Sequence, residues 1–331
     1  MEVWEYENDS ELLTLHSEFI PYPIPHERDP ISHIPYLISH NSYLISKTMK
    51  PSSFNTILAT ALCIIFASCG SNTSNNSTET QSMDTAKSTP SIKTEEVIYT
   101  SNGKQSKGFI AYDENHKGKL PIVVIIPEWW GVTDYVKSRA KQLAELGYFA
   151  IDADLFGDGK TAANPTEAMA FTKPYYTNPE LARPVVEAAI AKAATYSQAD
   201  SGRVAAIGYC FGGFIVLNAA KLGTPLKGIV SFHGGLGGVE PKKGLIQGDI
   251  LVCQGGSDPF VPEADQKAFK KSMDSVGAHY TFISYPGALH AFTNPGATEL
   301  GKKFNLPIAY NAAADTASWK EMQSLFLTAL K

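Results

Sequence analysis

Short apolar runs alternate with helical stretches from residue 94 to the end of the chain, and this alternation limits the possible folds most strongly. Val123–Pro127 is a β-branched run between turn signals, as expected of a strand buried on both faces. Further strands are expected at Phe149–Ile151, Val204–Gly208, Gly228–Phe232, Ile250–Cys253 and Tyr280–Tyr285, and helices at Val136–Leu146, Pro184–Tyr196, Phe211–Leu222, Glu263–Val276 and Thr316–Leu330. Strands separated by helices predict an α/β fold with a mostly parallel central sheet flanked by helices. A short leading β-hairpin is expected from Val97–Tyr99 and Gly108–Tyr112.

Charge and cysteine content exclude several classes of protein. The chain has 28 basic and 33 acidic residues, a net charge of -5, which predicts no nucleic-acid partner and no polybasic membrane patch. Four cysteines in 331 residues exclude a disulfide-stapled scaffold, and no His/Cys cluster has the spacing of zinc ligands. We therefore expect no metal and no organic cofactor, while the sequence sets no oligomeric state.

A lipoprotein-type signal peptide is predicted over residues 49–69. Lys50 precedes a short polar stretch, and the apolar run Ile57–Ser68 ends in small residues, as in a secretory signal. The run is shorter than the roughly 18 to 20 residues that span a bilayer. Its end resembles the lipobox of bacterial lipoproteins, with Phe66 where Leu or Val is usual. The resemblance implies that Cys69 is acylated, so the protein is expected to be exported and lipid-anchored to a bacterial membrane, on the periplasmic or outer-membrane side.

The segments around this signal differ in kind. Residues 1–48 carry eight acidic residues against Arg28 and Lys47, the wrong charge for a segment that leads into a membrane. We infer that translation starts at Met49 and that 1–48 is upstream sequence, expected to be disordered. Residues 70–93 are rich in Ser, Thr and Asn and predict a flexible linker. The folded domain is therefore expected at 94–331.

We expect the cellular protein to begin at an acylated Cys69 and to contain no peptide from residues 1–48, because signal cleavage follows a start at Met49. N-terminal sequencing or mass spectrometry of the cellular protein checks this. Peptides from 1–48 would contradict the start at Met49.

The segment Gly208–Gly213 carries the strongest chemical signal. It follows a predicted strand and opens a helix, which is the context of a G-x-nucleophile-x-G elbow. Its glycines allow a strained turn that projects Cys210 above the strand. The helix N-terminus beneath it favours a thiolate, so Cys210 is the candidate nucleophile.

A cysteine nucleophile needs a base, and the base needs a group that orients it. His290 and Asp258 each lie just past a predicted strand, in Pro286–Phe292 and Gly255–Pro259. The order nucleophile, acid, histidine is the chain order of α/β-hydrolases. His233 also ends a strand and is kept as a candidate substrate contact or a structural residue.

The elbow, the loops of Asp258 and His290, and the segment Pro127–Gly131 together resemble the dienelactone hydrolase family of the α/β-hydrolase superfamily. The resemblance covers 94–331. In that family a glutamate after the first core strand contacts the resting cysteine and accepts its proton, which implies this role for Glu128. The family's oxyanion hole implies the backbone N–H groups of Phe211 and Trp129.

The sequence departs from this family at the arginines that hold a substrate carboxylate. One of them lies a few residues past the histidine, where this chain has Asn294. The stretch Lys160–Thr177, which precedes the elbow, has no arginine at all, and the domain contains only Arg139, Arg183 and Arg203. We therefore expect a neutral ester or lactone rather than an anionic dienelactone.

The pocket is expected to be aromatic, and its candidate substrate contacts are Trp130, Tyr175, His233 and Asn294, with Trp129, Phe171 and Tyr176 nearby in sequence. Cys253 is expected to be a buried core residue, too far from Cys210 for a disulfide because a strand intervenes.

These patterns predict a hydrolase that cleaves a small carboxylic ester or lactone through Cys210, His290 and Asp258. Its partners are then a small-molecule substrate and, through Cys69 alone, a membrane. Two alternatives stay open: a non-catalytic binding lipoprotein on the same fold, and a cysteine acyltransferase or peptidase.

Overall fold

The computed structural model describes residues 89–331. Residues 1–88, with the expected upstream segment, the signal peptide and Cys69, lie outside the described residues, as does most of the expected linker. The first strand begins at Ile92, so the folded part starts two residues before the expected boundary at residue 94.

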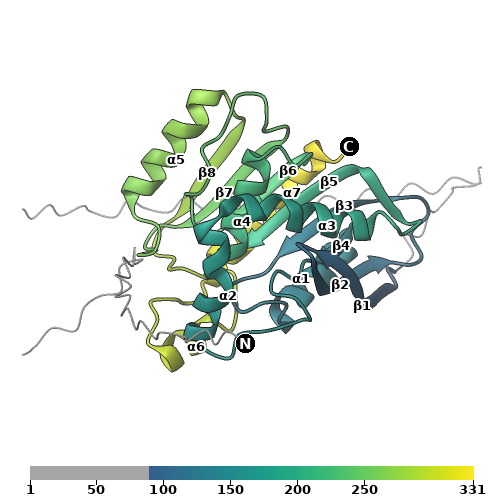
Figure 1. Ribbon diagram of the computed structural model, residues 1–331, viewed down its shortest axis with the longest axis horizontal. Coiled ribbons are helices and arrows are strands. Elements are labelled where there is room, and N and C mark those ends of the chain that lie inside the picture. Colours follow the sequence, from purple (N-terminus) through teal and green to yellow (C-terminus); the bar gives the residue numbers. More distant parts are fainter. Residues whose placement is uncertain (1–88) are drawn as a thin grey trace, which may run out of the picture. The chain divides into compact units, whose positions relative to one another are not determined.

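Strands and helices alternate through most of the described chain (Figure 1). The strands are β1 (Ile92–Ser101), β2 (Lys104–Asp113), β3 (Leu120–Ile126), β4 (Phe149–Asp152), β5 (Ala199–Tyr209), β6 (Gly228–Phe232), β7 (Asp249–Gly255) and β8 (Tyr280–Tyr285). The helices are α1 (Asp134–Glu145), α2 (Pro165–Thr177), the 3-10 turn η1 (Pro179–Leu181), α3 (Ala182–Ala193), α4 (Phe211–Lys221), α5 (Glu263–Val276), α6 (Ala297–Phe304) and α7 (Ala312–Ala329).

The strands form one mixed sheet in the order β1-β2-β4-β3-β5-β6-β7-β8. β1 pairs with β2, and β2 with β4, in antiparallel register, which confirms the expected leading hairpin. From β4 to β8 all neighbours are parallel. The expected α/β fold with a mostly parallel sheet is therefore confirmed.

Helices cover both faces of the sheet (Figure 1). Alternate residues of a strand therefore enter two separate cores, one on each face. On β3, Ile122 and Val124 join the core that holds residues of α3, α4 and α5. Val123 and Ile125 point to the other face and join residues of α1 and α7. Strands buried on both faces read as continuous apolar runs, and all of β3 is buried.

The expected elements agree with the structure best where an apolar run ends at a turn signal. Three of them, β6, α5 and β8, have the expected bounds. α7 begins at Ala312, four residues earlier than expected, because the side chain of Asn311 caps it by accepting from the Ala314 N–H.

Helices α2 and α6 were not expected. α2 contains Pro174 and has no clear apolar face, although Asn164 and Pro165 form a recognisable start signal.

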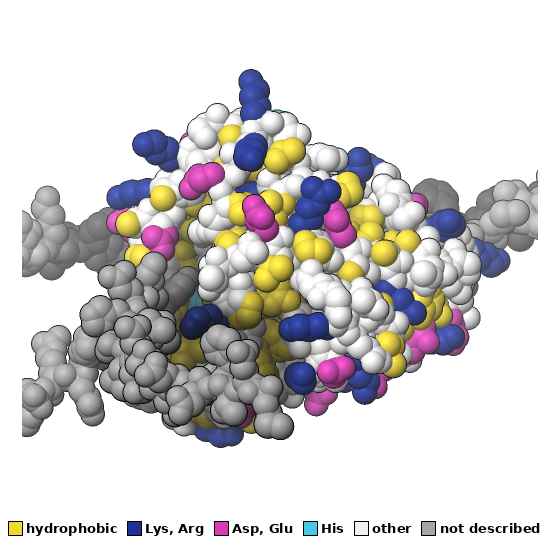
Figure 2. Space-filling model, viewed as in Figure 1, with side chains coloured by type: hydrophobic (Ala, Val, Ile, Leu, Met, Phe, Trp, Pro, Cys, Tyr) yellow, Lys and Arg dark blue, Asp and Glu magenta, His cyan; other side chains and the backbone are white. Residues whose placement is uncertain are grey.

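The surface carries both signs of charge. On the face drawn in Figure 2, Lys and Arg side chains are intermixed with Asp and Glu, with small groups of hydrophobic side chains between them. Within the described residues, none of the helices is both long and apolar enough to cross a membrane.

Candidate active site

The turn from β5 into α4 places Cys210 in a strained conformation. Cys210 has φ 55° and ψ -116°, a region that residues with a side chain seldom adopt. Glycines make the turn possible: a Cβ on Gly208 would lie 2.0 Å from the Gly212 carbonyl oxygen, and one on Gly212 would lie 2.1 Å from that of Ile126. The start of α4 therefore packs directly against the end of β3, and the half-buried Cys210 joins β5 to α4.

Cys210, His290 and Asp258 form one hydrogen-bonded chain. The His290 Nε2 lies 3.0 Å from the Cys210 Sγ, and the His290 Nδ1 lies 2.8 Å from the Asp258 Oδ2. The three residues follow β5, β8 and β7, whose carboxyl ends lie at one edge of the sheet because these strands run parallel. The structure thus brings together the three residues expected from the sequence.

The two partners of the His290 ring raise its pKa. Burial by itself lowers the pKa, but the charge interactions and hydrogen bonds with Cys210 and Asp258 outweigh burial and raise the pKa well above 6.5. A histidine with a raised pKa beside a cysteine sulfur is the arrangement that favours a thiolate.

Gln254 and Phe260, which the sequence did not indicate, complete the surroundings of Asp258. The Gln254 Nε2 donates to the Asp258 Oδ2 at 2.7 Å, and the Phe260 N–H donates to the Oδ1 at 2.8 Å. The Phe260 ring also packs against the His290 ring, with centroids 5.1 Å apart. The available signal was Gln254, a polar residue near the end of an otherwise apolar strand.

Glu128 lies just past β3, and its hydrogen bond goes to Asn294. The Asn294 Nδ2 donates to the Glu128 Oε2 at 2.6 Å, and both side chains are buried. Burial raises the pKa of Glu128 to about 7, and the Asn294 hydrogen bond offsets only part of that effect. The family resemblance implied a Glu128–Cys210 contact. In the structure the carboxylate is instead paired with the residue that replaces the family's arginine.

The resemblance implied the backbone N–H groups of Phe211 and Trp129 as oxyanion donors. Phe211 is the first residue of α4, and Trp129 follows Glu128 at the end of β3. Within residues 89–331 neither N–H donates a hydrogen bond to another protein group. Both are therefore available to an oxyanion.

Three of the candidate substrate contacts are occupied by the protein itself. Trp130 is buried and stacks on Phe304, with ring centroids 5.7 Å apart. The buried Tyr175 donates its hydroxyl to the Leu155 carbonyl at 2.6 Å. His233 is fully buried, and both of its ring nitrogens are hydrogen-bonded to protein groups.

Two of the three expected aromatic residues of α2 line a separate cavity, while the third, Tyr176, packs against Phe211 and Phe214. Phe171 and Tyr175, with Phe156, line a cavity of about 310 Å³ whose lining includes none of Cys210, Asp258 and His290. Trp129 is half-buried and contacts Trp130 edge to face.

Each arginine of the described residues is engaged elsewhere. The buried Arg139 donates to the Thr293 carbonyl and pairs with Asp315. Arg183 pairs with Glu187, and Arg203 with Asp200. Residues 89–331 also contain no group of three or more His, Cys, Asp or Glu that could hold a metal ion.

Cys253 is a core residue, as expected. It is fully buried in β7, which β6 separates from β5, and both Cys210 and Cys253 are free thiols. Burial raises the pKa of Cys253 to about 12, which leaves it an unreactive thiol.

A mostly parallel sheet, a strained elbow that carries a nucleophilic residue, and an acid and a histidine at later strand ends define an α/β-hydrolase. Solved structures agree with this class. The crystal structure of a dienelactone hydrolase-like promiscuous phosphotriesterase from metagenomic libraries is 33% identical, with a TM-score of 0.67, and the match covers 72% of this chain and 99% of that one. A *Pyrococcus horikoshii* acylaminoacyl peptidase, 13% identical with a TM-score of 0.54, shares the fold over 72% of this chain and 42% of its own.

Sequence comparison narrows the class to one family. Residues 107–330 match the profile of the dienelactone hydrolase family. A *Synechocystis* sp. protein with the provisional name carboxymethylenebutenolidase is 30% identical over 259 residues, which are 73% of this chain and 100% of that protein. A *Methylorubrum extorquens* protein of the same provisional name is 27% identical over 63% of this chain and 72% of its own. The chain belongs to the dienelactone hydrolase family, and it is a hydrolase.

The raised pKa of Glu128 predicts a pH-dependent stability. The folded protein binds the Glu128 proton more tightly than the unfolded chain does. The contribution of Glu128 to the free energy of unfolding therefore falls as the pH rises from 4.5, the usual pKa of a glutamate, to about 7. A shift of this size corresponds to about 3 kcal/mol. Glu128→Gln keeps an oxygen for the Asn294 amide and carries no charge. It should therefore gain up to about that much stability over the wild type between pH 5 and pH 8.

Urea unfolding at both pH values measures this difference. Glu145→Gln, at an exposed position on α1, is the matched control. An equal change in stability between the two pH values for wild type and Glu128→Gln would contradict a neutral, buried Glu128.

Proposed function

We propose that this protein cleaves a small carboxylic ester or lactone with Cys210 as the nucleophile, through an acyl-enzyme. The observation that carries the proposal is the continuous hydrogen-bonded chain from the Cys210 Sγ through His290 to Asp258. A thiol, a base and a group that orients the base, joined in this order, support nucleophilic catalysis.

In the first half of the reaction, the Cys210 thiolate attacks the carbonyl carbon, and the C=O electron pair moves to oxygen. The free N–H groups of Phe211 and Trp129 are the proposed donors to this oxyanion, and one such donor typically contributes about 3 kcal/mol. The C–O bond then breaks, and the alcohol oxygen takes the proton held by His290. An ester releases its alcohol here, whereas a lactone keeps it as part of the acyl group.

In the second half, His290, oriented by Asp258, takes a proton from water, and the resulting hydroxide attacks the thioester. The C–S bond breaks, which releases the carboxylic acid and returns the thiolate facing the imidazolium. Glu128 or His290 could first remove the thiol proton. The 3.0 Å Nε2–Sγ distance and the pairing of Glu128 with Asn294 favour His290.

We propose a neutral substrate rather than an anionic dienelactone. Asn294 takes the place of an arginine and is hydrogen-bonded to Glu128, and the three arginines of the domain are paired elsewhere. A substrate carboxylate near the buried Glu128 would have no arginine to pair with. It would also be repelled by Glu128 whenever the Glu128 carboxylate is ionised.

We also propose that the enzyme is exported and held at a membrane by a lipid on Cys69, which rests on the signal pattern of residues 49–69.

Cys210 is tested by acetate-ester hydrolysis under reductant. Cys210→Ala should lower kcat about a thousandfold or more, because the nucleophile is lost. Cys253→Ala, which removes the other described thiol, is the matched control and should stay active. Equal rates for the wild type and Cys210→Ala would remove Cys210 from the mechanism.

The same assay separates the alternatives. An acyl product formed on an added alcohol or amine in preference to water would support an acyltransferase. Hydrolysis of peptides in preference to esters would support a peptidase. No turnover of neutral or anionic esters and lactones would support the non-catalytic binding lipoprotein.

Substrate charge is tested with aryl esters of equal size. The wild type should hydrolyse an aryl pentanoate with kcat/KM about tenfold or more above that of the aryl hemisuccinate, because the added carboxylate is unpaired. Asn294→Arg should reverse part of this preference by supplying a bidentate partner, while Asn294→Gln should not. Equal kcat/KM for the two esters in the wild type would contradict a neutral substrate.

A further inference from the structure

His233 lies directly beneath the nucleophile turn. It is the residue that follows β6, its side chain is fully buried, and its φ of 43° is in the left-handed region. β6 lies between β5, which leads to Cys210, and β7, which leads to Asp258. A histidine at this point therefore sits among the segments that carry the site.

The hydrogen bonds of His233 determine its tautomer. The Cys210 backbone N–H donates to the His233 Nδ1 at 3.0 Å, and a backbone N–H can only donate, so Nδ1 carries no proton. The neutral ring therefore carries its proton on Nε2, which lies 2.7 Å from the Thr293 Oγ1 and donates to it. Burial, and then the charge on His290, hold the pKa of His233 well below 6.5, which keeps the ring neutral.

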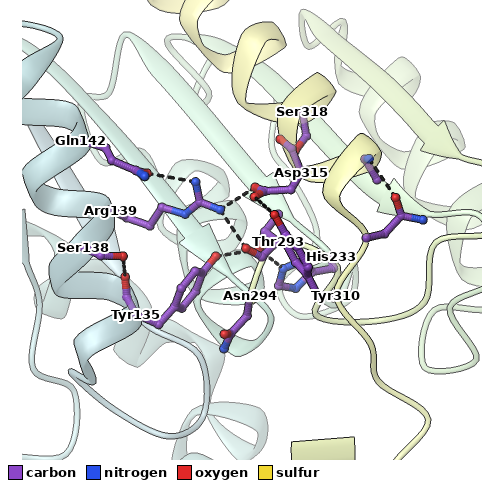
Figure 3. Close-up of polar contacts among 12 residues, drawn as sticks. Tyr135, Ser138, Arg139, Gln142, His233, Thr293, Asn294, Tyr310, Asp315 and Ser318 are labelled. Carbon is purple, nitrogen blue, oxygen red and sulfur yellow. Dashed lines mark hydrogen bonds and ion pairs between the residues drawn. The ribbon is translucent and has the colours of Figure 1, made fainter. Parts of the chain in front are cut away.

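Thr293 belongs to the loop of His290 and is anchored from the other side. Its hydroxyl is 2.7 Å from the Tyr135 hydroxyl, and its carbonyl accepts from the Arg139 Nη2 at 2.8 Å. Arg139 in turn pairs with Asp315 of α7. Figure 3 shows these side chains converging from α1, α7 and the loop between β8 and α6.

We propose that His233 and Thr293 form a brace that sets the distance between the Cys210 Sγ and the His290 Nε2, and that both act as positioning residues. The brace joins the Cys210 turn to Thr293, three positions past His290, through the rigid His233 ring and its two hydrogen bonds. Its effect on turnover rests on the proposed function, whereas its effect on the His290 ring does not.

The surrounding contacts explain why the brace aligns the site and is not needed to fold it. The Cys210 N–H also donates to the Phe232 carbonyl at 3.0 Å, which holds the turn in place without His233. The His290 loop has its own backbone bonds, from Ala309 to the His290 carbonyl and from Asn311 to the Phe292 carbonyl. Loss of the brace should therefore leave both segments folded but free to shift relative to each other.

Two substitutions remove the His233–Thr293 contact from opposite sides. Thr293→Val keeps the shape of the side chain and removes the acceptor oxygen. His233→Asn places a carbonyl oxygen near the Cys210 N–H, suits a left-handed φ, and cannot reach Thr293. Each should lower kcat for an acetate ester about tenfold or more with KM changed less than threefold, because misaligned groups affect the reacting geometry most. The double variant should be no slower than the slower single variant, since both changes remove one contact.

Two control variants separate alignment from general damage. Thr293→Ser retains the acceptor oxygen and should restore kcat to within about twofold of the wild type. Tyr135→Phe removes the other hydrogen bond to the same oxygen, leaves the brace, and should also stay within about twofold.

A readout independent of turnover uses purified protein labelled with ¹⁵N-histidine. The wild-type His233 should show a protonated Nε2 and an unprotonated Nδ1. The pH midpoint of His290, whose ring is surrounded by Cys210, Asp258, Glu128 and His233, should fall in Thr293→Val and His233→Asn and stay unchanged in Tyr135→Phe. A wild type without esterase activity that still shows these spectra would contradict the proposed function and support the brace. The brace is overturned by the opposite tautomer, by a His290 midpoint that does not move in either variant, or by additive losses of kcat in the double variant.

Discussion

The close approach of α4 to the ends of β3 and β5 is the constraint on which the site depends. It requires two positions without a Cβ, Gly208 and Gly212, and it forces Cys210 into a left-handed conformation. The same approach brings the loop after β3, with Glu128 and Trp129, next to the first turn of α4. The positions of Cys210, of the Phe211 and Trp129 N–H groups and of the buried Glu128 therefore follow from one packing contact between a helix and two strands.

His290 connects the two other residues of the hydrogen-bonded chain. Its ring lies between the Cys210 sulfur and the Asp258 carboxylate, and the Gln254 amide donates a further hydrogen bond to Asp258. The arginines of the domain stabilise structure instead: Arg139 joins α1 to α7 and to the His290 loop. Glu128 is paired with the neutral amide of Asn294, and the three arginines of residues 89–331 each pair with another carboxylate.

Sequence reasoning placed the strands well, because a strand buried on both faces must be a continuous apolar run between turns. It also placed Cys210, Asp258 and His290, since each lies within five residues of the end of a predicted strand. It missed helix α2, where Pro174 and a weak apolar pattern mask the start signal at Asn164. It missed Thr293 because its partners, His233 and Tyr135, are distant along the chain. It missed Gln254, only four residues from its partner Asp258, because the sequence pattern does not show which neighbour a buried Gln side chain meets.

Chain order and local pattern alone predicted the fold class, the turn after β5 and the three residues, Cys210, Asp258 and His290, that the structure joins by hydrogen bonds. The reason is that turn chemistry and strand burial are local properties. Only the tertiary structure decided that Glu128 pairs with Asn294 and that His233 supports the turn rather than facing a substrate. Those outcomes depend on which side chains meet across the sheet, and on the burial that favours hydrogen bonds between them over contact with water.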